Sequence, residues 1–230
     1  MVFNGFQKTT LLDFPGKVAC TVFTHGCNLR CPFCHNALLV NREESLPSFD
    51  EAEILAYLQK RKGIIDGICV SGGEPLLHPE LESFLQKVKE IGILVKLDTN
   101  GTLPDRMIRL IEEGLVDYVA MDIKNSKEKY ATTAGVPSVD LEKIEESIAY
   151  LIKGKIPYEF RTTVVKELHT LEDIQSISRM IKGAESYYLQ GFIDSGLLIG
   201  QNLSAHTPET LSLFCDEAKK ILKNVKIRGI

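Results

Sequence analysis

The stretch Cys27-Asn28-Leu29-Arg30-Cys31-Pro32-Phe33-Cys34-His35-Asn36 decides how the rest of the chain is interpreted. It places three thiols within eight residues, at CxxxCxxC spacing. A continuous helix is disfavoured here, because Pro32 lacks an N–H and its ring crowds the carbonyl four residues back. We therefore expect a loop. The thiolates of Cys27, Cys31 and Cys34 would suit a four-iron, four-sulfur cluster whose fourth iron stays open to a substrate or cofactor.

A structural zinc site is the alternative interpretation of the same cysteines. Zinc accepts sets of three cysteines and one histidine, and His25 or His35 would then be the fourth ligand. Structural zinc loops, however, more often pair two CxxC-like knuckles, and this sequence has no second knuckle. The spacing therefore favours iron over zinc.

The composition indicates an ordinary globular chain. Its 230 residues are 44% hydrophobic and 25% charged, which is enough to bury a sizeable core, and we expect one domain over residues 1–230. A formal net charge of −4 argues against a nucleic-acid-binding function, because no strong basic field is available. The basic tail from Lys219 to Arg228 is expected to be a solvated helix face and strand end.

The sequence contains no apolar run of membrane-spanning length. The start of the chain also lacks the charged-then-apolar pattern of a signal peptide, so we expect a cytoplasmic protein without a membrane partner. In that compartment cysteines act as metal or redox ligands more readily than as disulfides. The three cysteines outside the motif lie in apolar surroundings and are expected to be core residues: Cys20, Cys69 and Cys215.

Apolar strand segments and amphipathic helices alternate along the chain, which is typical of a parallel α/β architecture. A polar connection through Pro47 follows the cysteine loop, and Ser48 or Asp50 can cap the next helix, which contains Ile54, Leu55 and Leu58. The predicted strands are 18–24, 64–70, 93–97, 115–121, 158–165 and 187–192. Further helices are predicted at 79–91, 104–113, 141–152 and 171–181, before a last helix and short strand.

Polar motifs follow three of the predicted strands. They are Gly72-Gly73-Glu74-Pro75, Asp98-Thr99-Asn100-Gly101 and Asp122-Ile123-Lys124. Two glycines let a backbone approach a ligand closely, and Glu74 offers an acceptor for an ammonium group. Taken alone, the first two motifs also fit ordinary turns. Their shared place at strand ends favours a site instead, because these ends converge on one mouth of a β/α barrel.

These motifs together resemble the radical S-adenosylmethionine (SAM) superfamily, whose cysteine signature carries an aromatic residue before the third cysteine, here Phe33. Cys34-His35-Asn36 and Leu12-Asp13-Phe14-Pro15-Gly16-Lys17 look like the activating enzymes of glycyl radical enzymes. The resemblance runs from about Phe6 to Phe192. It implies a partial (β/α) barrel with parallel strands and helices outside, holding one 4Fe-4S cluster and SAM.

The resemblance also implies roles for single residues. Gly72, Gly73 and Glu74 would bind the SAM amino group, Lys124 would meet the SAM carboxylate, and His35 and Asn36 would lie by the adenine. Arg161 would help to hold SAM, although Lys166-Glu167 replace the Pro-Gly that the family often has after this strand. The remaining expected contacts with SAM come from Phe33, Asp98, Thr99, Asn100 and Asp122.

A monovalent cation beside SAM is a further expectation. Asp98 and Asp122 end neighbouring predicted strands, and two close carboxylates repel unless a positive charge lies between them. In the formate-lyase activating enzymes, which this chain also resembles, residues at these places hold such a cation. Lys124 could supply the charge instead and make a metal unnecessary.

The activity implied by the resemblance is reductive cleavage of SAM, followed by removal of a hydrogen from a glycine of a partner enzyme. The nearest resemblance makes that partner anaerobic ribonucleoside-triphosphate reductase; the alternatives are an enzyme of the pyruvate formate-lyase type, or a small-molecule reaction such as that of 7-carboxy-7-deazaguanine synthase. A zinc-stabilised binding protein is the non-enzymatic alternative. Only Cys69 lies between the cysteine loop and Glu74, so an external flavodoxin or ferredoxin is expected to donate electrons.

Overall fold

A computed structural model describes residues 1–41 and 46–229, and this part of the chain forms two compact units. Unit 1 comprises Met1–Asn28, Leu38–Thr99 and Asp105–Val119, and unit 2 comprises Leu29–Ala37, Asn100–Pro104 and Ala120–Ile230. Each unit is therefore assembled from separate stretches of chain. The single domain over residues 1–230 stays a prediction, and residues 42–45 of the predicted polar connection lie outside the described residues.

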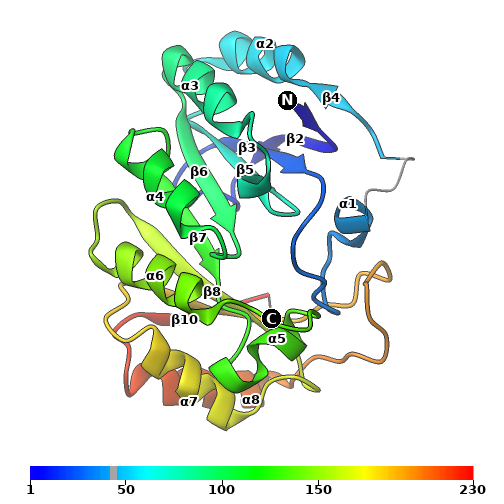
Figure 1. Ribbon diagram of the computed structural model, residues 1–230, viewed down its shortest axis with the longest axis vertical. Coiled ribbons are helices and arrows are strands. Elements are labelled where there is room, and N and C mark those ends of the chain that lie inside the picture. Colours follow the sequence, from blue (N-terminus) through cyan, green and yellow to red (C-terminus); the bar gives the residue numbers. More distant parts are fainter. Residues whose placement is uncertain (42–45, 230) are drawn as a thin grey trace. The chain divides into compact units, whose positions relative to one another are not determined.

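Unit 1 is built on a sheet of four strands in the order β6-β5-β3-β2 (Figure 1). β3 (Ala19–Thr24), β5 (Gly67–Gly72) and β6 (Leu94–Thr99) are parallel, and β2 (Gly5–Thr10) pairs with β3 in the antiparallel sense. A small second sheet pairs β1 (Val2–Phe3) with β4 (Phe49–Asp50). Parallel strands place their carboxyl ends at the same edge, so the chain that leads to Cys27 after β3 and the polar motifs at the ends of β5 and β6 share one edge of this sheet.

The helices of unit 1 form where capping and apolar periodicity agree. The Asp50 carboxylate accepts from the Glu53 N–H at 2.7 Å and begins α2 (Glu51–Arg61), which confirms the predicted cap. α3 (Leu81–Ile91) buries one apolar face, as predicted, through Leu81, Phe84, Leu85 and Val88. The remaining helical elements are α1 (Ala37–Asn41), η1 (Pro75–Leu77) and α4 (Pro104–Glu112). The first residues of α1 and α4 belong to unit 2.

Unit 2 has its own parallel strands, in the order β10-β9-β8. They are β8 (Tyr158–Val164), β9 (Tyr187–Gly191) and β10 (Val225–Arg228). β7 (Tyr118–Asp122) begins in unit 1 and ends in unit 2, where its last residues lie next to β8. In the part of unit 2 that the structure describes, the helical elements are η2 (Lys127–Lys129), α5 (Tyr130–Thr133), α6 (Leu141–Ile152), α7 (Leu171–Met180) and α8 (Pro208–Lys219).

The sequence predictions of the elements hold best where apolar residues repeat with a clear period. The predicted strand at 64–70 begins only at Gly67, because Ile64 lies in a turn and is 62% exposed. β2 was not predicted, since Gln7, Lys8 and Thr9 are exposed and leave no apolar alternation to detect. The prediction that Cys20, Cys69 and Cys215 are core residues is confirmed, because all three are buried.

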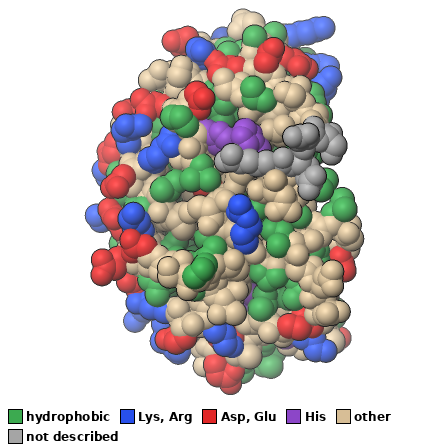
Figure 2. All heavy atoms as spheres, turned by 45° about the vertical axis from the view of Figure 1, so that its right-hand side comes forward, with side chains coloured by type: hydrophobic (Ala, Val, Ile, Leu, Met, Phe, Trp, Pro, Cys, Tyr) green, Lys and Arg blue, Asp and Glu red, His purple; other side chains and the backbone are tan. Residues whose placement is uncertain are grey.

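The drawn face of the molecule carries charges of both signs. In Figure 2, lysine and arginine side chains lie among aspartate and glutamate side chains towards the edge of this face, and most of its middle is hydrophobic or uncharged. A mixed pattern of this kind produces no strong field of one sign over that face. Among the residues that the structure describes, no helix has the length and apolarity that crossing a bilayer requires.

Candidate functional site

The two glycines at the end of β5, Gly72 and Gly73, are required by the close approach of another part of the backbone. The Gly73 N–H donates to the Thr24 carbonyl and the Glu74 N–H to the Gly26 carbonyl, both at 2.9 Å. A Cβ on Gly73 would collide with the Gly26 carbonyl. Gly72 has φ +116°, and a Cβ on it would collide with the Thr24 backbone. The backbone that approaches these glycines is therefore the turn just before Cys27. Whether a ligand also approaches them stays a prediction.

Glu74 is buried and already engaged within unit 1. Its side chain is 1% exposed, and Oε1 accepts hydrogen bonds from the Leu76 N–H at 3.2 Å and from Thr99 Oγ1 at 2.9 Å. The carboxylate thereby caps η1 and connects the β5 motif to the β6 motif. The structure thus brings two predicted site residues together, Glu74 and Thr99, while the contact of Glu74 with the SAM amino group stays a prediction.

A buried lysine, not predicted as part of the site, pairs with Asp98. Cys69 and Lys96 are register partners on β5 and β6, so Ser71 and Asp98, two residues further on, share their face of the sheet. The Lys96 ammonium, only 1% exposed as a residue, donates to the Asp98 carboxylate and lies 3.6 Å from Cys69 Sγ. Ser71 Oγ donates to the other Asp98 oxygen at 3.1 Å. Asp98 therefore has a fixed positive charge beside it.

Two histidines make polar contacts that hold the chain segment leading to Cys27. His25 Nδ1 lies 3.0 Å from Asn4 Oδ1, and His78 Nε2 lies 2.9 Å from the His25 carbonyl oxygen. The two imidazole rings meet edge to face, with centroids 4.9 Å apart. His25, which the zinc interpretation offers as a fourth ligand, thus has polar and aromatic partners within unit 1.

The second half of the cysteine motif lies in unit 2 and forms the predicted loop. The Cys34 N–H donates to the Cys31 carbonyl at 3.0 Å, in a turn that contains Pro32 and no helix. Burial raises the pKa of the Cys31 thiol, and the Lys124 ammonium opposes this shift. Burial also raises the pKa of the Cys34 thiol, and a hydrogen bond from the Asn36 backbone opposes it. A bound cation or metal is therefore what would favour both thiolates.

Asp122 joins two cations at the end of β7. Its carboxylate accepts from Lys124 Nζ at 3.1 Å and from Arg161 Nε at 2.9 Å. Burial acts to raise the pKa of Asp122, but Arg161 and Lys124 outweigh it and lower the pKa to about 2. Burial acts to lower the pKa of Lys124, but the Asp122 carboxylate outweighs it and holds the pKa above its ordinary value. Both groups are therefore charged at neutral pH.

These contacts bear on the expected monovalent cation, which stays a prediction. That expectation depended on two carboxylates without a counter-charge, yet Asp98 pairs with Lys96, and Asp122 pairs with Lys124 and Arg161. Opposite charges this close keep a carboxylate ionised without a metal. The sequence offered Lys124 as a substitute for the metal, whereas Lys96 was not considered, although residues two apart on one strand share a face.

The other predicted site residues of unit 2 have local partners. Phe33 is buried and its ring faces His169, with centroids 6.5 Å apart. His169 Nε2 in turn lies 2.8 Å from the Lys124 carbonyl oxygen. Asn100 Oδ1 accepts from the N–H and the hydroxyl of Thr102, at 3.0 and 2.6 Å, which is the turn chemistry expected of this motif. Asn36 takes part in the Cys34 turn through its backbone.

A cavity of about 290 Å³ opens beside His35 in unit 2. It is lined by His35, Thr163, Gln190, Gly191, Ile193, Arg228 and Gly229. The expectation of a solvated strand end is wrong for Arg228. Its guanidinium forms a bidentate pair with the buried Glu159, at 2.8 and 2.9 Å, and the guanidinium carbon lies 3.3 Å from the centroid of the Tyr188 ring. No sequence signal pointed to this contribution from beyond Gly200, since Glu159 and Arg228 lie 69 residues apart.

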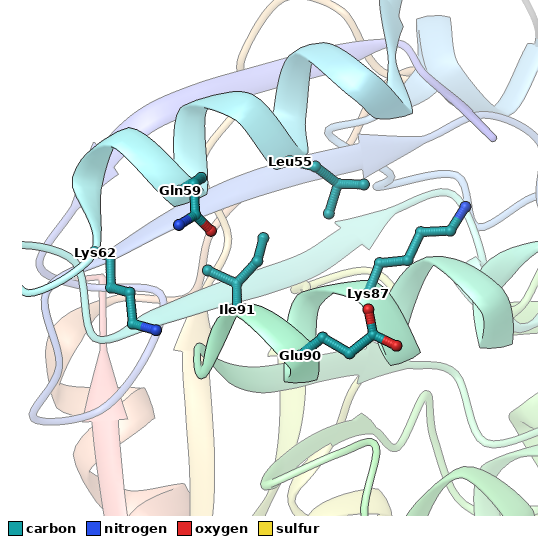
Figure 3. Close-up of a pocket in the computed structure, with 6 residues that line it drawn as sticks. All are labelled: Leu55, Gln59, Lys62, Lys87, Glu90 and Ile91. Atoms are coloured by element: carbon teal, nitrogen blue, oxygen red, sulfur yellow. The ribbon is translucent and has the colours of Figure 1, made fainter.

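A second hollow, in unit 1, has no link to the motifs. Figure 3 shows it between α2 and α3, where a cavity of about 450 Å³ is lined by Leu55, Gln59, Lys62, Lys87, Glu90 and Ile91. Its charges are mixed, and Lys87 pairs with Glu51. None of these residues is a predicted site residue, so the candidate site stays with the strand ends.

One buried group in unit 2 fits a metal cluster at Cys31. Tyr130 is fully buried, and its hydroxyl forms no hydrogen bond of standard geometry to any residue that the structure describes. α5, which begins at Tyr130, is fastened to the cysteine loop, because the Arg30 N–H donates to the Ala134 carbonyl at 2.8 Å. A buried donor without an acceptor suits a place where a sulfur ligand would accept it.

The three cysteines of the motif are divided between the two units, and their role as cluster ligands stays a prediction. Cys27 belongs to unit 1, whereas Cys31 and Cys34 belong to unit 2. Within residues 1–41 and 46–229, no three histidine, cysteine, aspartate or glutamate side chains form a group that would hold a metal ion. The donor set itself, three cysteines at CxxxCxxC spacing, fits a four-iron cluster with one open iron.

Comparison with known proteins shows which family the chain resembles in sequence. The sequence model of the Radical SAM superfamily matches residues 21–181. The chain is 31% identical to a Methanocaldococcus jannaschii protein named "Putative glycyl-radical enzyme activating enzyme", over 99% of this chain and 95% of that protein. It is also 34% identical to the 7-carboxy-7-deazaguanine synthase of Methanopyrus kandleri, over 48% of this chain and 51% of that protein.

The fold is shared with solved structures of low sequence identity. Streptococcus suis SuiB superposes with a TM-score of 0.69 at 14% identity, covering 91% of this chain and 48% of that chain. This likeness confirms the fold class predicted from the sequence: an α/β fold with mostly parallel strands, of the partial-barrel type.

Proposed function

The chain belongs to the radical SAM superfamily, and from this premise we propose that it is an activating enzyme that generates a glycyl radical on a partner enzyme. The observation that carries the proposal is similarity to a protein named for this activity over nearly the full length of both chains. The deazaguanine synthase matches only about half of each chain. A small-molecule reaction is therefore the second candidate.

The cofactors implied by the family are a 4Fe-4S cluster and SAM. When bound, they supply the reductive cleavage of the SAM carbon–sulfur bond that starts radical chemistry. We assign the cluster to Cys27, Cys31 and Cys34. The task of the protein is to hold these groups in fixed orientation and to exclude water from them. The buried Glu74 and Thr99, joined by their hydrogen bond, suit that task.

The charged residues of unit 2 suit the amino-acid end of SAM. Lys124 and Arg161 are held in place by Asp122, so that their positive charges are oriented before a carboxylate arrives. Lys124 acts on Cys31 through its charge, which favours the thiolate that a cluster needs. For the adenine end we propose the cavity beside His35, whose lining also includes Gln190 and Arg228.

The charge that keeps Asp98 ionised is, in our proposal, Lys96 and not a metal cation. SAM cleavage by the wild-type chain should then be the same with Na⁺, K⁺ or a tetraalkylammonium ion at constant ionic strength. Lys96→Met should cost about 3 kcal/mol of folding stability, because it leaves a largely buried carboxylate without its counter-charge. Lys96→Met should also weaken SAM binding, measured by calorimetry. Na⁺ should restore part of the lost stability and part of the lost SAM affinity.

SAM cleavage by the wild type could instead be severalfold faster in Na⁺ or K⁺ than in tetraalkylammonium. That result would contradict this proposal and support the monovalent cation expected from the sequence. Lys87→Met is the matched control, since it removes the same charge from an exposed pair with Glu51. It should change neither SAM affinity nor the response to Na⁺.

The partner that we propose is anaerobic ribonucleoside-triphosphate reductase, with electrons from a flavodoxin or ferredoxin; a pyruvate formate-lyase type enzyme is the alternative. The direct test mixes the reconstituted chain with reductant, SAM and each candidate partner under strict anaerobiosis. We expect a glycyl radical doublet in the electron paramagnetic resonance spectrum of the reductase. Turnover of a free deazapurine precursor without any doublet would overturn the proposal in favour of the second candidate. Stoichiometric zinc without a brown chromophore would instead establish the zinc-stabilised binding protein.

A further inference from the structure

Tyr130 stands out among the buried polar groups of the chain. Its side chain is 0% exposed, and among the side chains that the structure describes its hydroxyl is the buried oxygen or nitrogen that lacks a hydrogen-bond partner. A buried hydroxyl without an acceptor is unfavourable, so native proteins seldom keep one without a reason. Tyr187 shows the usual arrangement: it is equally buried, and its hydroxyl donates to Thr162 Oγ1 at 2.8 Å.

The surroundings of the Tyr130 hydroxyl belong to the candidate site. Besides burial, the groups that act on the hydroxyl are the three charged or ionisable side chains of Lys124, Cys31 and Asp122, together with the Lys124 backbone. A backbone N–H can only donate to the hydroxyl oxygen, so it leaves the hydroxyl proton without an acceptor. Lys124 and Asp122 already pair with each other at 3.1 Å. Of the three, Cys31 is the group whose capacity to accept a hydrogen bond would change most on metal binding, since a thiol sulfur is a weak acceptor and a thiolate a strong one.

The backbone holds the end of α5, four and five residues after Tyr130, against the cysteine loop. The Arg30 N–H donates to the Ala134 carbonyl, and the Ala134 N–H donates to the Tyr130 carbonyl, both at 2.8 Å. Gly135 leaves no room for a side chain against the Arg30 carbonyl and the Cys31 N–H. α5 therefore cannot move away from the cysteine loop without breaking these contacts.

We propose that Tyr130 is a positioning residue that donates its hydroxyl hydrogen bond to the sulfur of Cys31 when that sulfur is a cluster ligand. The inference deepens the proposed function and rests on its assignment of Cys31 as a ligand. A hydrogen bond to a ligand sulfur stabilises the reduced, more negative state of the cluster, so Tyr130 raises the reduction potential and eases electron entry.

The test compares the wild-type chain with Tyr130→Phe in two states. In the metal-free state, Tyr130→Phe should melt at the same temperature as the wild type or at a higher one, because the substitution removes an unsatisfied hydroxyl. After anaerobic reconstitution, both should bind four irons, and the midpoint potential of Tyr130→Phe, followed by electron paramagnetic resonance of the reduced cluster, should be more negative. Tyr187→Phe is the matched control: it should melt lower and keep the wild-type potential.

The outcomes separate the inference from the proposed function. Equal potentials in the wild type and Tyr130→Phe would overturn the inference and leave the proposed function intact. A lower melting temperature of metal-free Tyr130→Phe would also overturn it, because the hydroxyl would then have a partner within the protein. A wild-type chain that binds no iron would overturn both.

Discussion

Replacing Cys31 with alanine is expected to abolish the iron–sulfur chromophore and SAM cleavage together. Three thiolates hold three irons of a cluster with one open iron, and two cannot hold it in the same way. The loss should be complete within the sensitivity of absorbance at 400 nm and of an assay for released methionine. Each substitution removes one of the three proposed thiolate ligands, so Cys27→Ala and Cys34→Ala should have the same effect.

Cys215→Ala provides the matched control for this prediction. Cys215 is buried, and its Sγ lies 3.6 Å from the Val225 carbonyl oxygen, away from the cysteine motif in sequence. The substitution removes one small buried group and should cost about 1 kcal/mol of stability while sparing the cluster. Retention of four irons by Cys31→Ala, or their loss from Cys215→Ala, would show that the ligands have been assigned wrongly.

The second large effect is expected from Gly135→Ala. Gly135 has φ +68°, where a Cβ costs about 1–2 kcal/mol in any surroundings. A Cβ there would also collide with the Arg30 carbonyl, so the cysteine loop would have to move. We expect a loss of more than about 3 kcal/mol in the free energy of unfolding, because overpacking adds to the strain. Iron content after reconstitution should fall as well, since Cys31 follows Arg30 directly.

Gly114→Ala separates strain from collision. Gly114 has nearly the same backbone angle, φ +70°, but a Cβ on it would meet nothing within 4 Å. Its substitution should therefore cost only the strain, about 1–2 kcal/mol, and leave iron content unchanged. If urea unfolding gave equal losses for the two variants, the close approach of Gly135 to the cysteine loop would have no energetic weight.

The sequence alone indicated those features that depend on residues close together in the chain. The cysteine loop follows from three cysteines and Pro32 within eight residues, and the buried face of α3 follows from apolar residues three and four apart. The cap at Asp50 follows from one side chain and the N–H three residues on. In each case the interacting groups are set by local backbone geometry, so pattern and spacing are enough to predict them.

Much of the candidate site was also visible as motifs, but the partners of its residues were not. The sequence marks Glu74, Asp98 and Asp122 as acids at strand ends, and it is silent on which groups meet them. Asp98 pairs with Lys96 on its own strand, and the same lysine faces Cys69 only because β5 and β6 pair in that register. A register shift of one residue would have sent Lys96 to the other face.

Only the tertiary structure decided the contacts made over long sequence separations. Glu159 and Arg228 form their bidentate pair across 69 residues, and Tyr130 reaches the surroundings of Cys31 from a short helix with no sequence signal of its own. Gly73 is required because the Gly26 backbone crosses it, 47 residues earlier in the chain. Such contacts depend on strand order and on how loops close. The free energy that stabilises these contacts comes from packing of the whole core, and a short stretch of sequence cannot predict it.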